Sequence, residues 1–178
     1  MDILQLQELA LQAGFSKAVF LDVDTVEVRS EVRDMCASGT CQKYGTNWAC
    51  PPACGTLEEC DSRIHAYKRG ILVQTIGDLE DEYDGESMME TQARHKKQFA
   101  EFLSVVRSAY PNTLALGAGC CSICSSCSYP NEKCRFPEKA VSSMEAYGIL
   151  VMDLCKANQL DYYYGSLHIA YTSCYLLD

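Results

Sequence analysis

The chain has 178 residues, of which 48% are hydrophobic and 22% charged, and these proportions exclude a disordered or collagen-like polymer. Its 24 acidic and 15 basic residues give a formal net charge of −9 at pH 7. Nucleic acids and anionic membranes attract basic surfaces, so this charge argues against either of them as the main partner. The length is typical of one domain, and we expect a single domain over residues 1–178.

Hydrophobic periodicity and turn signals predict alternating helices and strands. In chain order we expect a helix over 3–13, strands over 17–23 and 26–29, a helix over 56–69, a strand over 71–77, a helix over 86–110, a strand over 113–119, a helix over 142–156 and a strand over 168–177. Capping boxes begin two of these helices, Thr56 with Glu59 and Ser142 with Glu145.

This alternation predicts an α/β fold, with a small mixed or mostly parallel sheet flanked by helices. Two cysteine-rich segments interrupt the alternation, and we expect both to be metal-binding loops. The acidic run over 78–86 is expected to be a solvated loop.

The cysteine count, 12 in the whole chain, is the unusual feature of the composition. The N-terminal residues lack the pattern of a signal peptide, and no segment approaches the roughly 18 consecutive apolar residues that span a bilayer. We therefore expect a cytoplasmic protein that binds no membrane. Because thiols stay reduced there, clustered cysteines indicate metal ligands or redox groups before disulfides.

The stronger cysteine motif lies in the second half of the chain, where Cys121, Cys124 and Cys127 follow one another at three-residue steps and Cys134 comes later. This spacing is the same as that of the first three cysteines in the bacterial ferredoxin motif, in which thiolates hold a [4Fe–4S] cluster. Zinc sites usually pair two C-x-x-C units across a longer loop, so zinc fits this spacing less well.

The first motif is looser and consists of Cys36, Cys41, Cys50 and Cys54. The Cys50-Pro51 step resembles the Cys-Pro step of ferredoxins, where proline shapes the loop around sulfur. Taken alone, this spacing fits a cluster, a zinc ion or redox thiols. The residue that completes the set is Cys54, Cys60 or Cys174.

The other candidate groups carry weaker signals. Cys120 is expected to point away from its neighbour Cys121, and Cys155 is expected to be a buried core thiol. The three histidines are dispersed without metal-ligand spacing, and the chain has no glycine-rich nucleotide motif.

The two cysteine-rich segments and the ending YTSCYLL together resemble a family of bacterial and archaeal proteins described as predicted metal-binding, domain of unknown function 2284. The resemblance spans about Arg33 to Leu177. It implies a metal, with iron–sulfur favoured, in organisms that are largely anaerobic. The motif residues carried over are Cys36, Cys41 and Cys50 in the first half, and Cys121, Cys124, Cys127 and Cys134 in the second.

Three functional hypotheses follow from these patterns. The first is an electron-transfer protein in which the two sets of four thiolates hold two [4Fe–4S] clusters and serve a redox partner protein. The second is a reductase in which one cluster keeps an iron position open to substrate. The third is a structural zinc protein whose metals only fix the loops. No reaction, substrate or catalytic residue is assigned from the sequence.

Overall fold

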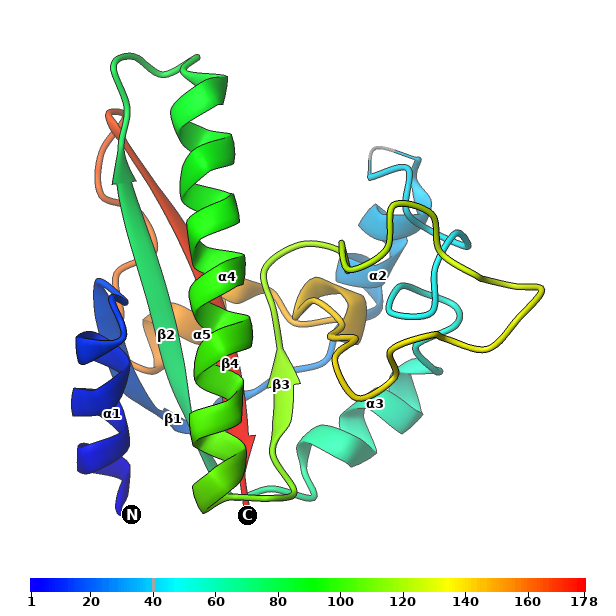
Figure 1. Ribbon diagram of the computed structural model, residues 1–178, viewed down its shortest axis with the longest axis horizontal. Coiled ribbons are helices and arrows are strands. Elements are labelled where there is room, and N and C mark those ends of the chain that lie inside the picture. Colours follow the sequence, from blue (N-terminus) through cyan, green and yellow to red (C-terminus); the bar gives the residue numbers. More distant parts are fainter. Residues whose placement is uncertain (40) are drawn as a thin grey trace.

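The computed structural model describes residues 1–39 and 41–178, and a four-stranded sheet forms the centre of this part of the chain (Figure 1). The strands are β1 (Lys17–Asp22), β2 (Arg69–Asp78), β3 (Leu114–Leu116) and β4 (His168–Leu177), in the spatial order β1-β2-β4-β3. Every neighbouring pair is antiparallel. The expectation of a mixed or mostly parallel sheet was therefore wrong.

The reason is the place that the last strand takes in the sheet. Both β2 and β3 pair antiparallel with β4, so β2 and β3 run in the same direction, as a strand–helix–strand unit requires. β4 comes from the far end of the chain and inserts between them, which makes every contact in the sheet antiparallel. Local sequence patterns carry no signal for such an insertion.

Five α-helices and two 3-10 helices are present among the described residues. They are α1 (Ile3–Gln12), η1 (Val23–Thr25), α2 (Ser30–Ala37), α3 (Leu57–Ile64), α4 (Gly85–Ala109), η2 (Glu145–Tyr147) and α5 (Val151–Ala157). The capping box predicted at Thr56 is confirmed, because the Thr56 hydroxyl and the Glu59 carboxylate each accept a hydrogen bond from the other residue's backbone amide. The helix ends at Ile64, earlier than predicted.

The helix predicted over 142–156 is broken in the structure into η2 and α5. Gly148 lies between them with φ of 79°, and a Cβ atom there would approach the Leu57 side chain to 2.8 Å. Only glycine adopts this backbone conformation without strain in so small a space. The strand predicted over 26–29 is also absent, and Val28 makes only an isolated bridge to Ile149.

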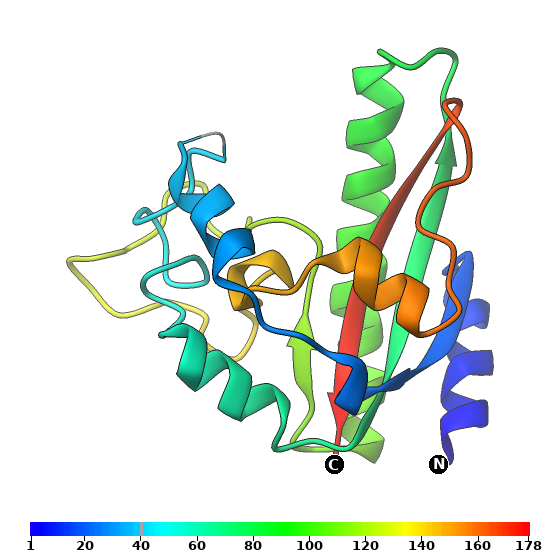
Figure 2. The same cartoon turned by 180° about the vertical axis from the view of Figure 1, so that it is seen from behind.

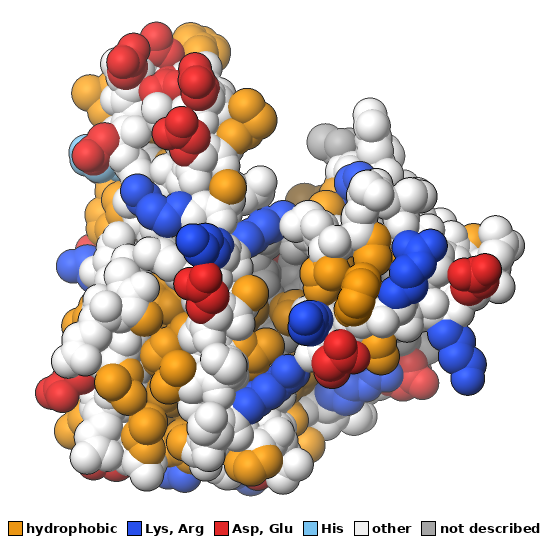
Figure 3. Space-filling model, in the orientation of Figure 1, with side chains coloured by type: hydrophobic (Ala, Val, Ile, Leu, Met, Phe, Trp, Pro, Cys, Tyr) orange, Lys and Arg blue, Asp and Glu red, His pale blue; other side chains and the backbone are white. Residues whose placement is uncertain are grey.

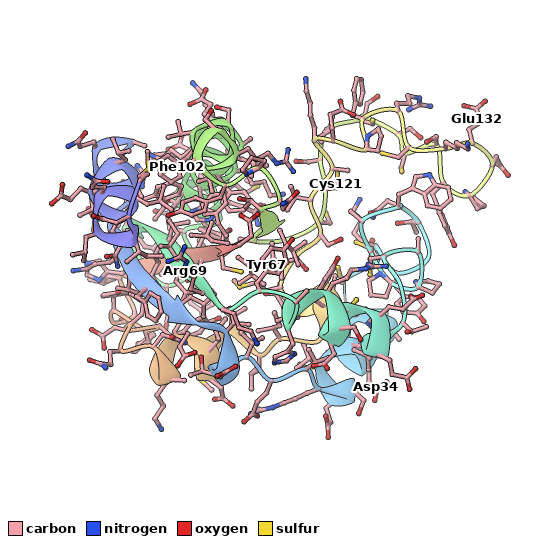
Figure 4. The ribbon with its side chains drawn as sticks, turned by 90° about the horizontal axis from the view of Figure 1, so that it is seen from below. Asp34, Tyr67, Arg69, Phe102, Cys121 and Glu132 are labelled. Carbon is pink, nitrogen blue, oxygen red and sulfur yellow. The ribbon has the colours of Figure 1, made fainter. Side chains whose placement is uncertain are left out.

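Alternate residues of the central strands fill a separate core on each face of the sheet. Seen from below, α1 and α4 cover one face and α5 lies on the other (Figure 4). The α4 face buries Ile71, Val73, Phe99, Phe102 and Tyr175, and the opposite face buries Leu72, Met144, Leu154, Cys174 and Leu176. The sheet and its helices therefore form a packed platform to one side of the cysteine-rich segments.

A polar network crosses the core under α4. The imidazole of His95 is fully buried, with Nδ1 2.8 Å from Thr75 Oγ1 and Nε2 2.7 Å from Ser173 Oγ. Burial, with a smaller contribution from the charge of Lys96, lowers the pKa of His95 to about 4. His95 is therefore neutral in the folded protein at pH 7, and it joins α4 to β2 and β4.

This pKa predicts an acid-sensitive contribution to stability. The unfolded chain binds a proton at His95 below about pH 6.5, whereas the folded chain resists protonation until about pH 4. The contribution is complete above pH 6.5 and is lost as the pH falls to 4, at a cost of about 3 kcal/mol. We expect a shallower fall in the free energy of unfolding for His95→Gln over this range, measured by urea denaturation. Parallel pH profiles for the two proteins would contradict the assignment.

Candidate metal centre

The two cysteine-rich segments are far apart in sequence but lie side by side in the structure (Figures 1 and 2). One follows α2 and contains Trp48, and the other follows β3 and contains Tyr129. The indole Nε1 of Trp48 donates a hydrogen bond of 3.0 Å to the carbonyl oxygen of Glu132. The ring of Trp48 also meets that of Tyr129 edge to face, with centroids 5.0 Å apart. These contacts join both segments into one lobe beside the sheet.

The structure brings the four cysteines of the second motif together. Cys121, Cys124, Cys127 and Cys134 all line one small cavity of about 30 Å³. Asn47, Trp48 and Ala49, from the first segment, form another part of its wall. Four cysteines of one loop therefore line a single cavity, and the other loop supplies a further part of its wall.

The backbone around Cys127 is arranged to stabilise a thiolate. Burial alone would raise the pKa of this thiol, but hydrogen bonds from the backbone amides of Tyr129, Trp48 and Ser128 outweigh burial and lower the pKa. The positive charge of Arg135 acts in the same direction. Amide hydrogens directed at a cysteine sulfur are the environment that metal-bound thiolates require.

Three cysteines of the first motif are also neighbours. Cys36 is in the last turn of α2, Cys41 is exposed, and Cys50 is buried. Burial raises the pKa of Cys50, the hydrogen bond with Asn47 lowers it, and the nearby thiols of Cys120, Cys41 and Cys36 raise it further. Cys120 is thus an additional thiol beside this set, although its position next to Cys121 in the sequence did not indicate this.

Cys54, the fourth residue predicted for the first site, has a different arrangement. Its thiol hydrogen-bonds to Cys60 and lies 3.6 Å from the carbonyl oxygen of Ala146. The pKa of Cys54 is raised by this hydrogen bond and by burial, whereas the pKa of Cys60 is lowered to about 6, first by the bond from Cys54. These two buried thiols form a pair, although Cys54 also lies near Cys50.

Arg33 of α2 is a functional candidate that sequence reasoning missed. Its Nη2 atom lies 3.3 Å from the sulfur of Cys60 and 3.6 Å from that of Cys54. The guanidinium also donates to the carbonyl oxygens of Gly55 and Ala146, which ties α2 to the start of α3 and to η2. A cation among thiols offsets the negative charge that thiolate ligands create. The helical position of Arg33, one turn before Cys36, is the only sequence signal for it.

The two remaining thiols are core residues. Cys155 and Cys174 both belong to the apolar core on the α5 face of the sheet. Burial raises the pKa of Cys155 to about 11 and that of Cys174 to about 12. Both therefore stay protonated in this environment and pack as small hydrophobic side chains.

The thiols gather at two places without converging on one point. Among residues 1–39 and 41–178, no three Cys, His, Asp or Glu side chains are close enough to hold a single metal ion. The donor chemistry nevertheless fits a thiolate-bound metal, because four thiols share one cavity and one of them receives several amide hydrogens. In addition, Arg33 Nε is buried without a hydrogen-bond partner in the part of the chain that the structure describes, which leaves a donor near the pair of Cys54 and Cys60.

The mixed α/β fold and the two groups of thiols define a cysteine-rich protein with the features of a metal-binding class. The family model described as "Predicted metal-binding protein (DUF2284)" matches residues 19–177, and the chain belongs to this family. No curated protein and no solved structure showed significant similarity to the chain. Within the described residues, no helix has both the length and the apolar character needed to cross a membrane.

Proposed function

We propose that this chain is an iron–sulfur protein that transfers electrons to a redox partner protein and holds two [4Fe–4S] clusters through cysteine thiolates. The observation that carries the proposal is the shared cavity of Cys121, Cys124, Cys127 and Cys134. When bound, such a cluster supplies one-electron redox chemistry at a potential that the protein tunes through hydrogen bonds and burial. Reduced thiols in this number fit a reducing compartment, and we infer a cytoplasmic location.

The charges around the thiols support this proposal. Four basic residues lie within the cysteine-rich segments 36–56 and 117–141, against two acidic residues: Lys43, Lys133, Arg135 and Lys139, with Glu132 and Glu138. A [4Fe–4S]²⁺ cluster with four thiolates carries a charge of about −2, so these cations offset the charge of the ligands. The acidic residues of the loop between β2 and α4 lie at the N-terminal end of that helix, apart from the cysteine-rich lobe (Figure 3).

This distribution also indicates how a partner would dock. The proposed electron-transfer sites lie in a lobe whose charged side chains are mainly basic, although the whole chain is acidic. Complementary charge favours an acidic surface on the redox partner where it meets this lobe. Electron transfer to such a partner would slow as salt concentration rises, because added ions screen the attraction.

Reversible reduction tests the electron-transfer role. Protein prepared without oxygen is titrated with dithionite and then reoxidised with one-electron mediators, while the visible spectrum is recorded. We expect a broad visible band that bleaches on reduction and returns on oxidation. A protein whose spectrum does not respond to dithionite would contradict the proposal.

A structural zinc protein is the second candidate, and the size of the cavity is the observation that favours it. A space of about 30 Å³ holds an ion or a water molecule, whereas a cluster of four irons requires the loop to spread. Residues 118–142 contain no helix or strand, and Ser125 and Ser126 are exposed, so such a movement would break local contacts such as the 2.9 Å hydrogen bond from Arg135 Nη1 to the Ser126 carbonyl oxygen.

The fourth ligand of the first site is open to a direct test. The proximity of Cys120 to Cys50, and the pairing of Cys54 with Cys60, favour Cys120 in this role. We therefore expect Cys120→Ser to reduce bound iron by up to about half, and Cys54→Ser to retain it. Iron per chain, measured on both variants, decides between the two residues. Loss of iron from Cys54→Ser alone would show that Cys54 is the fourth ligand. Full retention of iron in both variants would support a site with three thiolates and an open iron position.

A further inference from the structure

A large groove separates α4 from the segment that carries the second cysteine motif. Its volume is about 620 Å³, within the range of sites that bind small molecules. The walls come from the middle and last turns of α4, from residues 117–123, and from residues 138, 139 and 141. In Figure 3 the molecule is hollowed between the part formed by α4 and the cysteine-rich lobe, with basic side chains at the edges.

The walls of the groove are mainly apolar. Phe99 and Leu103 contribute from α4, and Ala118, Ile123 and Val141 contribute from the facing segment. His95 and Ser173 lie behind this lining, fully buried and bonded to each other at 2.7 Å, so they support the wall and offer no polar group to a ligand. An apolar surface of this kind favours a ligand with a hydrophobic body.

Three cations line the groove, which makes it favourable for a negative group. Lys96 and Arg107 belong to α4, and Lys139 belongs to the facing segment. Lys96 Nζ donates to the carbonyl oxygen of Cys120 at 3.1 Å, and Arg107 Nη1 donates to that of Glu138 at 2.8 Å. Lysine has three N–H donors and arginine has five, so each retains donors for a ligand. Glu101 and Glu138 are the acidic lining residues, which leaves an excess of one positive charge.

The groove adjoins the cavity of the second cysteine motif. Cys121 and Ile123 line both spaces. In Figure 4, Cys121 lies where the segment passes from the sheet to the cysteine-rich lobe. A molecule in the groove would therefore rest beside a residue of the proposed second site.

We propose that this groove binds a small organic acid with an aromatic or aliphatic body. The carboxylate faces Lys139 and Arg107, which is bonded to the carbonyl oxygen of the adjacent Glu138, and the body packs against Phe99, Leu103 and Val141. The match of one anionic group to the excess positive charge selects the acid over its neutral analogue. This site is separate from the thiol-lined cavity, although its facing wall belongs to the same loop, residues 118–142.

The test compares 2-naphthoate with 2-naphthamide, which has the same ring system without the charge. Binding of each probe to protein prepared without oxygen is measured by isothermal titration calorimetry. We expect naphthoate to bind at least tenfold more tightly than naphthamide. In Lys139→Gln this preference should fall severalfold, whereas naphthamide affinity stays the same. Lys139 is the cleaner charge variant because Lys96 also holds the Cys120 carbonyl.

A pair of matched tryptophan variants locates the binding. Ala100 is an exposed residue of α4 that lines the groove, and Ala93 is an exposed residue two turns earlier that does not. Ala100→Trp should obstruct part of the groove and weaken binding of both probes, and Ala93→Trp should leave both affinities unchanged. Circular dichroism spectra identical to the parent protein would show that the variants remain folded.

Three results would overturn the proposal. The first is equal affinity for the acid and the amide, which would indicate an apolar patch only. The second is unchanged binding of both probes by Ala100→Trp. The third is no measurable binding of naphthoate. Failure of the proposed function is detected separately, as an absence of iron and sulfide. Naphthoate binding with the expected preference in a protein without iron would support the groove while rejecting the iron–sulfur role.

Discussion

Replacing Cys124 with alanine is expected to remove about four iron and four sulfide ions per chain, half of the proposed content. Cys124 is the middle residue of the C-x-x-C-x-x-C motif and lines the cavity together with Cys121, Cys127 and Cys134. A cluster that loses one of four thiolates exposes an iron to solvent and becomes labile. The remaining metal should reside with the first cysteine motif. Iron and acid-labile sulfide, determined on the same anaerobic sample, measure the effect.

Cys155→Ala is the matched control for this experiment. Cys155 is a fully buried thiol of α5 in the core on that face of the sheet. Its replacement removes a sulfur atom without changing either cysteine-rich segment. We expect the control to keep its full iron content, with at most a modest loss of stability from the smaller side chain. Full iron content in Cys124→Ala would contradict the assignment of the second site, whatever the control shows.

The second large effect is expected for Arg33→Met. The guanidinium donates to the carbonyl oxygens of Gly55 and Ala146, and it lies 3.3 Å from the sulfur of Cys60. Methionine keeps much of the side-chain length but leaves these acceptors without a donor. We expect the free energy of unfolding to fall by about 2–4 kcal/mol, since each unsatisfied buried group costs about 1–3 kcal/mol. We also expect weaker metal retention at the first site, which loses a neighbouring positive charge.

Arg29→Met is the control for the Arg33 variant. Arg29 precedes α2 and pairs with Glu27 and Asp153, with its side chain 34% exposed. Exposed ion pairs contribute about 0–1 kcal/mol, so this variant should unfold close to the parent protein in urea. Equal losses in the two variants would show that Arg33 acts only as a surface residue.

Much of the secondary structure could be predicted from the sequence, because helices and strands follow from local periodicity. The capping box at Thr56 begins a helix as expected, and the strand ending at Leu177 has its predicted bounds. The antiparallel pairing of neighbouring strands could not be predicted, since it depends on β4 inserting between β2 and β3. The break at Gly148 was missed because it arises from packing against Leu57, which is distant in sequence.

In the candidate site, too, the features within one short segment could be predicted from the sequence, and those between distant segments could not. The second cysteine motif lies within one short segment, so its spacing was enough to predict that its four thiols lie near one another. The first motif depends on residues brought together by the fold. The proximity of Cys120 to Cys50 and the position of Arg33 beside Cys60 arise from contacts between separate segments. The groove beside Cys121 likewise has walls from α4 and from residues 117–141, which no local pattern connects.

The metal content of the protein decides whether the cysteine-rich segments hold iron–sulfur clusters. Iron, acid-labile sulfide and zinc per chain are determined on strictly anaerobic protein, together with a visible spectrum of the same sample. We expect about eight iron and eight sulfide ions per chain, with a broad visible band that bleaches on reduction. About two zinc ions per chain without sulfide or colour would contradict the iron–sulfur proposal, and the cysteine-rich segments would then be loops held by structural zinc.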